Sequence, residues 1–108
     1  MDNQQNELVT VAMQIILHAG DARILAKQAL TDAKKFDFVQ AEQKIKEADD
    51  AIVQAHKSQT DIIQDEMSGE HYEYSLLFAH AQDTLMTIMS ELNMTKEMID
   101  ILKLVSSK

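Results

Sequence analysis

The stretch Phe78-Ala79-His80-Ala81-Gln82-Asp83-Thr84-Leu85-Met86-Thr87 lies within a long helical pattern that has no Pro and no interior Gly. Two polar side chains in it, His80 and Asp83, stand three positions apart among apolar neighbours. Residues at this spacing lie about 60° apart around a helix axis, on neighbouring sides of one face. Each side chain therefore meets different surroundings. We expect His80 at the rim of a helical bundle and Asp83 directed into a subunit interface.

The composition predicts an all-α protein. The 108 residues include no Pro and no Cys, and Gly occurs only at Gly20 and Gly69. A chain without helix breakers that is rich in Ala, Leu, Ile, Met, Gln, Glu and Lys is nearly all helix. The absence of Cys excludes disulfides, thiol catalysis and Cys-based zinc sites. The length predicts a single domain that spans residues 1–108.

The net charge of −8 argues against binding to nucleic acid or to an anionic membrane surface. Residues 2–7 are all polar, and the N-terminus lacks the basic start of a signal peptide. No apolar run comes near the roughly 20 residues that a membrane-spanning helix needs. The sequence therefore predicts a soluble, cytoplasmic protein without membrane insertion.

Apolar residues at alternating spacings of three and four predict a first helix over about 6–31 and a second from near Asp37 to about 65–66. Asp37 with Gln40 resembles a capping box. The core positions of the first helix are Leu8, Val11, Ile15, His18, Ala22, Leu25 and Ala29. Those of the second are Phe38, Ala41, Ile45, Ala48, Ile52, Ala55, Gln59 and Ile62.

A third helix is expected over about 70–105, after a connection at 67–70 that Gly69 marks. Its core positions are Tyr74, Phe78, Ala81, Leu85, Ile88, Leu92, Thr95, Ile99 and Leu102. The apolar pattern continues through 93–95, so we expect one unbroken helix there. Short connections make consecutive helices antiparallel neighbours. The chain should form an up-down-up three-helix bundle.

The third helix carries more apolar surface than one bundle uses. A second stripe runs beside the core positions: Leu76, Ala79, Asp83, Met86, Ser90 and Asn93, with Met89 and Met94 on its flank. A helix that is apolar on two faces is buried on two sides. We therefore infer a homo-oligomer built on the third helix.

Four His residues are candidates for chemistry. His18 lies on the core positions of the first helix, where a hydrogen-bonded structural role is the simpler interpretation. His56 is expected at a boundary, and His71 is expected to be exposed beside the connection. His80 lies one step off the core positions, where structural and functional roles both stay open.

Other chemistries have little support. The chain has no HExxH motif, no His-x3-His pair and no EF-hand loop, and no Gly-rich phosphate loop. One face of a helix is a poor place for an oxyanion hole. Between Ser58 and Thr95 there is no Lys or Arg. A phosphoryl group on His80 would be weakly held by neutral donors such as Gln82 and Thr84, which suits a relay.

Three blocks of the sequence resemble the lactose/cellobiose (chitobiose) family of enzyme IIA components of the bacterial phosphotransferase system (PTS). They are residues 19–23 (AGDAR), residues 55–60 (AHKSQT) and residues 80–87 (HAQDTLMT). The third block is the most specific of the three, and the resemblance covers nearly the whole chain. It implies a cytoplasmic homotrimer of three-helix subunits that works as a phosphohistidine relay.

The resemblance also implies roles for single residues. His80 would accept phosphate from the phosphocarrier HPr and pass it to a cysteine of enzyme IIB, while the sugar is taken up through the membrane component IIC. Asp83 would face the trimer axis, where three copies hold a divalent cation such as Mg²⁺; no organic cofactor is implied. Many members have a second His where this chain has Thr84, so any phosphate-orienting role of that His is lost or replaced.

A neutral imidazole nitrogen is a competent nucleophile near pH 7, and in-line phosphoryl transfer depends mainly on positioning. Gln82 is a candidate donor to a phosphoryl oxygen, and Asp83 is expected to be structural rather than a base. Two alternatives stay open: a helical adaptor that only oligomerises, and a regulatory paralogue that is phosphorylated but feeds no transporter. Ala81 and Thr84 favour a cellobiose or chitobiose branch over a lactose branch.

Overall fold

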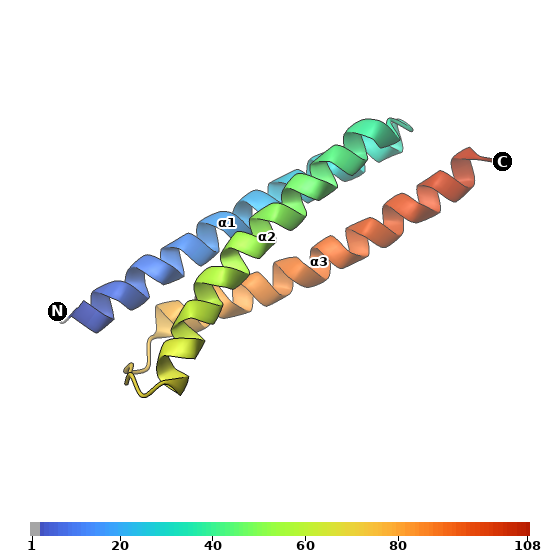
Figure 1. The fold of residues 1–108 in the computed structure, drawn as a ribbon. Helices are drawn as coiled ribbons and strands as arrows, with labels where there is room; N and C mark the ends of the chain where they lie inside the picture. The colour runs from blue at the N-terminus through green and yellow to red at the C-terminus, as the bar shows by residue number, and fades with distance from the viewer. Residues whose placement is uncertain (1–2) are drawn as a thin grey trace.

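The structure, a computed structural model, describes residues 3–108 and consists of three helices that run along one rod (Figure 1). They are α1 (Asn3–Lys34), α2 (Phe38–Met67) and α3 (Leu76–Ser106). Successive helices reverse direction, so α1 and α3 run parallel and α2 runs against both. The rod measures 59 × 21 × 19 Å. The predicted up-down-up bundle is confirmed, and α3 passes through 93–95 without a break.

The core is built from small residues on α1 and larger ones on α3. The buried side chains of α1 include Ala12, Ala19, Ala22, Ala26, Ala29 and Ala33. Leu85, Ile88 and Ile99 of α3 are fully buried against them. Small residues let helix backbones approach closely, and α1 packs extensively on both of its neighbours. In contrast, α2 and α3 touch at few points.

The turn between α1 and α2 is fixed by local polar contacts. Phe36 adopts a left-handed backbone with φ of 62°. The side chain of Asp37 then accepts a hydrogen bond from the backbone N–H of Gln40 at 3.2 Å, which starts α2. Lys44 Nζ lies 2.6 Å from Asp32 Oδ2 and ties the two helices together. The N-cap half of the predicted capping box is therefore confirmed. The N–H of Asp37 donates to the Asp32 carbonyl instead of to the Gln40 side chain.

The start of α3 differs from the sequence prediction. The helix begins at Leu76 rather than near 70, because Ser75 is extended and its hydroxyl accepts the backbone N–H of Phe78 at 3.1 Å. The preceding segment follows the end of α2, where the Tyr72 hydroxyl donates to Asp65 Oδ2 at 3.0 Å. Tyr74, predicted to be a core residue, is 83% exposed in this segment. That prediction was wrong because 70–75 are not helical.

Although α1 has no long unbroken apolar run, its mean hydropathy is high. The part Asn6–Lys34 is long and apolar enough to cross a membrane by length and composition, with a mean hydropathy of 1.4. A core helix of a bundle passes the same test. One face of α1 lies in this core. Only 28% of the apolar window is buried, so part of its apolar surface, including Leu17 and Ile24, stays exposed.

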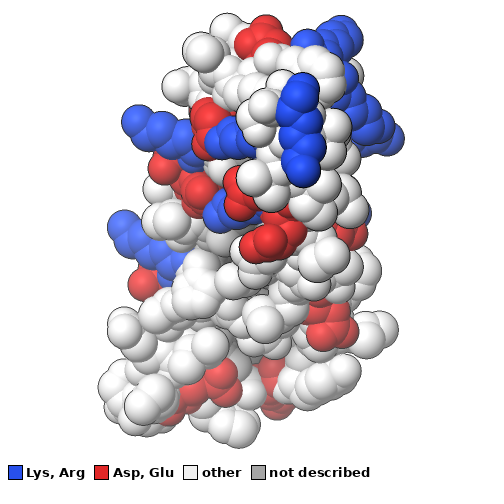
Figure 2. All heavy atoms as spheres, turned by 90° about the vertical axis from the view of Figure 1, so that its right-hand side faces the viewer, with Lys and Arg blue, Asp and Glu red and all other residues white. Residues whose placement is uncertain are grey.

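Charges are segregated along the rod. Figure 2 shows Lys and Arg side chains over the upper part of the molecule and only Asp and Glu among the coloured residues of the lower part. The lower end holds the connection between α2 and α3 (Figure 1). This distribution follows from the stretch between Ser58 and Thr95, which has no basic residue.

Candidate functional site

His80 lies on the second turn of α3 with an exposed side chain. The neighbouring core residues Ala81, Leu85 and Ile88 are buried almost completely. At 100° per residue, His80 points about 110° away from the middle of that buried face. Among the residues that the structure describes, none forms a hydrogen bond or ion pair with its ring. The expected position at the rim is confirmed, and the side chain is exposed there.

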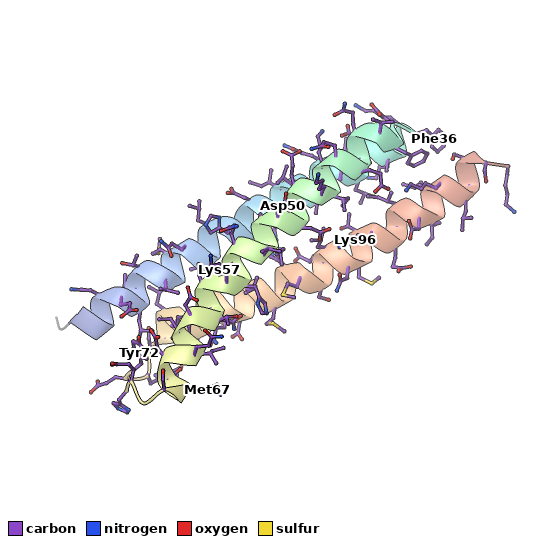
Figure 3. The ribbon with its side chains drawn as sticks, viewed as in Figure 1. Phe36, Asp50, Lys57, Met67, Tyr72 and Lys96 are labelled. Atoms are coloured by element: carbon purple, nitrogen blue, oxygen red, sulfur yellow. The ribbon has the colours of Figure 1, made fainter. Side chains whose placement is uncertain are left out.

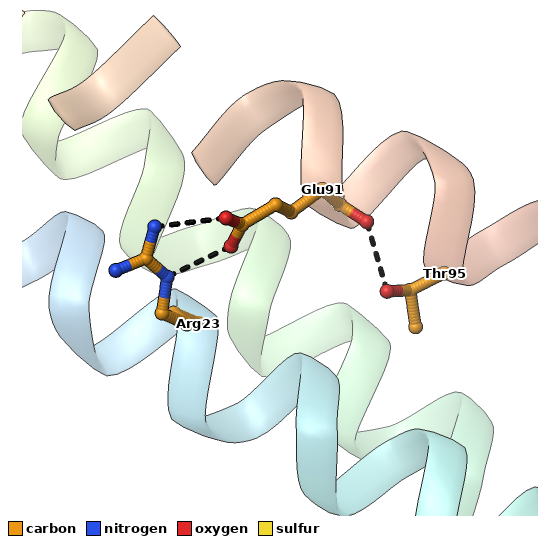
Figure 4. Close-up of polar contacts among 3 residues, drawn as sticks. All are labelled: Arg23, Glu91 and Thr95. Carbon is orange, nitrogen blue, oxygen red and sulfur yellow. Dashed lines mark hydrogen bonds and ion pairs between the residues drawn. The ribbon is translucent and has the colours of Figure 1, made fainter. Parts of the chain in front are cut away.

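The side of α3 that carries His80 faces α1. Glu91 leaves the helix within about 20° of the direction of His80, three turns further along. Arg23 of α1 holds Glu91 with two hydrogen bonds, from Nε and Nη2, each 2.8 Å long (Figure 4). These bonds raise the pKa of the Arg23 guanidinium. Arg23 is therefore neutralised by Glu91 and lies about 16 Å from the height of His80.

Two neutral donors were predicted near His80, and the structure treats them differently. The Thr84 hydroxyl donates to the His80 backbone carbonyl at 2.8 Å, so its proton is already used. Gln82 leaves the helix about 160° from His80. It lines a pocket of about 180 Å³ on the opposite flank, together with Phe78 and Ala79. Within one chain, Gln82 and His80 are not brought together.

Asp83 is exposed on the outer side of α3, about 170° from the buried face. The apolar residues along this side are also uncovered: Leu76 is 75% exposed, and Met86 is 58% exposed. The second stripe therefore has no partner within the described part of the chain. The same part contains no group of three His, Cys, Asp or Glu residues that could hold a metal ion. One chain supplies Asp83 alone, so a cation site here requires several copies.

The other three His residues lie elsewhere. His18 is half-buried on α1, and no hydrogen bond of its ring is found among the described residues. His56 is exposed on α2, with Nδ1 3.4 Å from the Thr60 hydroxyl. His71 is exposed in the connection before α3, as expected.

The sequence did not reveal the contacts that fix α3 in place. Arg23 and Glu91 are 68 residues apart and follow no motif that links them. The bond between Tyr72 and Asp65 is closer in sequence, yet Tyr72 carries no local signal for it. Both pairs depend on how the helices pack, which a residue pattern does not specify.

The comparison with known proteins agrees with the all-α fold. Residues 10–103 match the sequence model of the family described as "PTS system, Lactose/Cellobiose specific IIA subunit". The chain belongs to this family. A lactose-specific EIIA component of Staphylococcus epidermidis is 37% identical over 92% of the chain and 95% of its own length. A lichenan-specific enzyme IIA component of Bacillus subtilis is 40% identical over 88% of the chain and 86% of its own length.

Solved structures of IIA proteins share the architecture. A cellobiose-specific enzyme IIA from Bacillus anthracis superimposes with a TM-score of 0.89 at 36% identity, over 100% of this chain and 95% of that one. A chain of the Escherichia coli IIA(Chitobiose)–HPr complex gives a TM-score of 0.80 at 33% identity, over 92% of this chain and 96% of that one. The IIA family consists of phosphotransferase relay proteins, so the chain is a PTS phosphotransferase component of the lactose/cellobiose type.

Proposed function

We propose that this chain carries a phosphoryl group on His80 between HPr and its cognate enzyme IIB. The supporting observation is the position of His80, an exposed imidazole without a partner among the described residues, on the helix that carries the family-like block 80–87. The complex of a similar IIA protein with HPr supports HPr as the donor. The acceptor on enzyme IIB would be a cysteine, and the sugar would be phosphorylated during uptake through IIC.

The chemistry fits an exposed, neutral imidazole. A nitrogen lone pair attacks the phosphorus of the phosphorylated donor, the donor nitrogen leaves, and the reverse sequence delivers the group to a thiolate. No Lys or Arg between Ser58 and Thr95 competes for the phosphoryl oxygens. The bound state would therefore be reactive rather than trapped. The incoming partners would supply the stronger donors.

The substrate class would be a β-linked disaccharide. Similar proteins are named for lactose, lichenan, cellobiose and chitobiose. Ala81 and Thr84 favour the cellobiose or chitobiose type. The IIA component would not contact the sugar, so its specificity would be for its enzyme IIB. The work would take place in the cytoplasm, by a single domain that spans residues 1–108.

A homotrimer around α3 would complete the assembly. The exposed second stripe supports it, with Asp83 of three copies converging on a divalent cation such as Mg²⁺. In such an assembly, opposite flanks of neighbouring α3 helices face each other. The Gln82 that donates to a phosphoryl group on His80 would then belong to the next subunit.

The decisive experiment is phosphorylation by phosphoenolpyruvate, enzyme I and HPr. The wild-type chain should gain an acid-labile, base-stable phosphate, and His80→Ala should gain none while keeping its helicity. His71→Ala, which changes an exposed imidazole in the connection before α3, is the matched control and should be labelled normally. Labelling that survives in His80→Ala would refute the assignment.

The same assay separates the alternatives. An oligomeric adaptor would not be labelled at all. A regulatory paralogue would be labelled but would not transfer the group to the cysteine of any enzyme IIB encoded beside it. Transfer to enzyme IIB is therefore the result that supports a transport role.

A further inference from the structure

Two largely exposed stripes with the same spacing lie on neighbouring helices, one on α1 and one on α2. The α1 ridge consists of Leu17, Gly20, Ile24 and Lys27, at spacings of three, four and three. The α2 stripe consists of Asp50, Val53, Lys57 and Thr60, at the same spacings. Both stripes are about 80° wide around their helices. Leu17 is 61% exposed and Val53 is 60% exposed, so apolar area lies open on both.

Gly20 has no explanation within its own chain. A glycine inside a helix costs roughly 0.5–1 kcal/mol relative to alanine. A Cβ added at Gly20 would meet nothing within 4 Å, so no contact in the chain requires its absence. Gly20 lies in the middle of the α1 ridge, between Leu17 and Ile24. Because Gly20 has no side chain, it leaves a notch in the ridge. Such a notch would let another helix approach α1 closely.

The α2 stripe borders an apolar groove. This groove, of about 480 Å³, lies where α2 and α3 barely touch. It is lined by Ile52, Val53, His56, Lys57, Thr60 and Met89. No described residue of the same chain fills it. A helix with a narrow ridge is the shape that such a groove accommodates.

The ridge and the stripe lie at the same heights along the rod. Arg23 bonds to Glu91, and Lys96 bonds to Asp49, which fixes how far the three helices are shifted along one another. Counting from these pairs at 1.5 Å per residue puts Leu17 level with Thr60, and Ile24 level with Val53, within about one turn. Gly20 is level with Lys57. If copies of the chain are related by rotation about an axis parallel to the rod, each residue keeps its height. The ridge of one copy can then meet the stripe of the next.

The charges at the upper end of the two stripes are complementary. The same counting puts Lys27 of the ridge level with Asp50 of the stripe. Neither side chain has an ion pair within residues 6–108. Asp50 and Lys57 lie two turns apart along α2 (Figure 3). Lys57, at the height of Gly20, could extend its aliphatic stem across the notch.

We propose that the α1 ridge of one copy seats against the α2 stripe and groove of the next copy. The contact joins two different surfaces, so it is heterologous and closes into a ring with α3 of every copy toward the axis. Gly20 would meet Lys57, and Lys27 would pair with Asp50 across the seam. This rests on the oligomer of the proposed function and specifies its second contact surface. His80 lies about 8 Å below the lowest ridge position, so it stays outside the seam.

Cysteine cross-linking tests the arrangement directly, because the chain has no Cys of its own. The double variant Ile24→Cys/Val53→Cys should form covalent dimers and closed rings under mild oxidation. The double variant Ile24→Cys/Gln54→Cys is the matched control and should form few, since Gln54 leaves α2 about 100° further round. If Ile24→Cys alone cross-links as well as the double variant, the contact is isologous and the proposal is wrong. The absence of intermolecular cross-links in the double variant would also overturn it.

Charge exchange gives a second readout that needs no engineered thiol. Lys27→Glu and Asp50→Lys should each raise the dissociation constant of the oligomer several-fold at low salt, and the double exchange should restore it. Asp61→Lys makes the same charge change about 16 Å further along α2 and should leave the dissociation constant nearly unchanged. A double exchange no better than the single ones would contradict the pairing. Phosphate labelling of His80, followed in the same samples, shows separately whether the proposed function holds.

Discussion

His80 and Asp83 share one turn of α3 but have different surroundings. His80 is on the flank that faces α1, whereas Asp83 is on the outer side, opposite the core. This difference follows from the 60° between positions three apart. It lets one residue stay available to partner proteins while the other is free to enter an assembly. A contact made by one of these side chains therefore does not have to cover the other.

Sequence reasoning could place His80 and Asp83 because helix rotation alone determines their directions. The same count of 100° per residue puts Gln82 on the far flank, so its separation from His80 was also within reach. The bond between Arg23 and Glu91 was not, because it depends on how α1 and α3 pack. The direction of a side chain around its own helix follows from its position in the sequence. The placement of one helix against another depends on many weak contacts, which a residue pattern does not specify.

Tyr72 should make stability depend on alkaline pH. Its partial burial, the hydrogen bond to Asp65 and the nearby charge of Glu7 raise the pKa of its phenol to about 12. The folded state therefore holds the phenol proton more tightly than the unfolded state, whose Tyr has a pKa of about 10. This contribution is complete below pH 10 and is lost as the pH rises toward 12.

Tyr72→Phe should lower the free energy of unfolding by about 1 kcal/mol at pH 7, since it leaves Asp65 without its donor. The difference from wild type should shrink between pH 10 and 12. Urea unfolding at several pH values measures both effects. Tyr74→Phe, at a largely exposed position, is the control and should match wild type throughout. A difference that does not change with pH would contradict the proposed cause.

At the scale of elements, α3 is positioned by its first turn. Ser75, five residues before His80, ends the extended connection. Its hydroxyl caps the helix by accepting a hydrogen bond from the backbone N–H of Phe78. The sequence prediction placed this start too early because residues 70–74 contain no Pro or Gly. Helix propensity is a weak prior, and the cap together with the contact of Tyr72 overrides it here. The long parts of all three helices were predictable because their apolar residues repeat at helical spacing over many turns.

Ser75→Ala should destabilise the N-terminal turns of α3 by about 1 kcal/mol, because the N–H of Phe78 loses its acceptor. Amide exchange at 78–80 should accelerate more than exchange in the middle of α3. Ser58→Ala is a suitable comparison. The Ser58 hydroxyl only bonds back to the Gln54 carbonyl within α2, and alanine is the better helix former. Equal acceleration in both variants would argue against a specific cap at Ser75.

At the scale of the whole molecule, HPr and enzyme IIB should compete for one surface. If His80 carries the phosphoryl group as proposed, both partners bring an atom to the same nitrogen, so their footprints overlap there. The stretch 58–95 offers no positive charge, so docking should use apolar and neutral polar side chains around His80. NMR titration of the labelled chain with each partner should shift a shared set of amides. Two separate footprints occupied at the same time would contradict a relay through His80.

The assembly should depend on Asp83 and on a cation. Three carboxylates at a three-fold axis would lie within a few ångströms of one another. At about 4 Å and an effective dielectric constant near 20, each like-charge pair costs roughly 4 kcal/mol. That cost would oppose the burial of Leu76 and Met86 unless something neutralises the charges. A divalent cation with oxygen ligands does so, and shared protons are the alternative.

Sedimentation at micromolar concentration separates these cases. With a cation at the axis, a chelator should weaken the wild-type oligomer at neutral pH, and added Mg²⁺ should restore it. Asp83→Leu should make assembly insensitive to chelator and no weaker, because an apolar side chain removes the charges from the interface. Asp61→Leu, at an exposed position of α2, is the control and should keep the response to chelator.

If shared protons act instead, assembly should tighten as the pH falls, with or without chelator. A wild-type chain that stays monomeric or dimeric in every condition would rule out an axial role for Asp83, and phosphorylation of His80 would then have to be judged by the labelling assay alone.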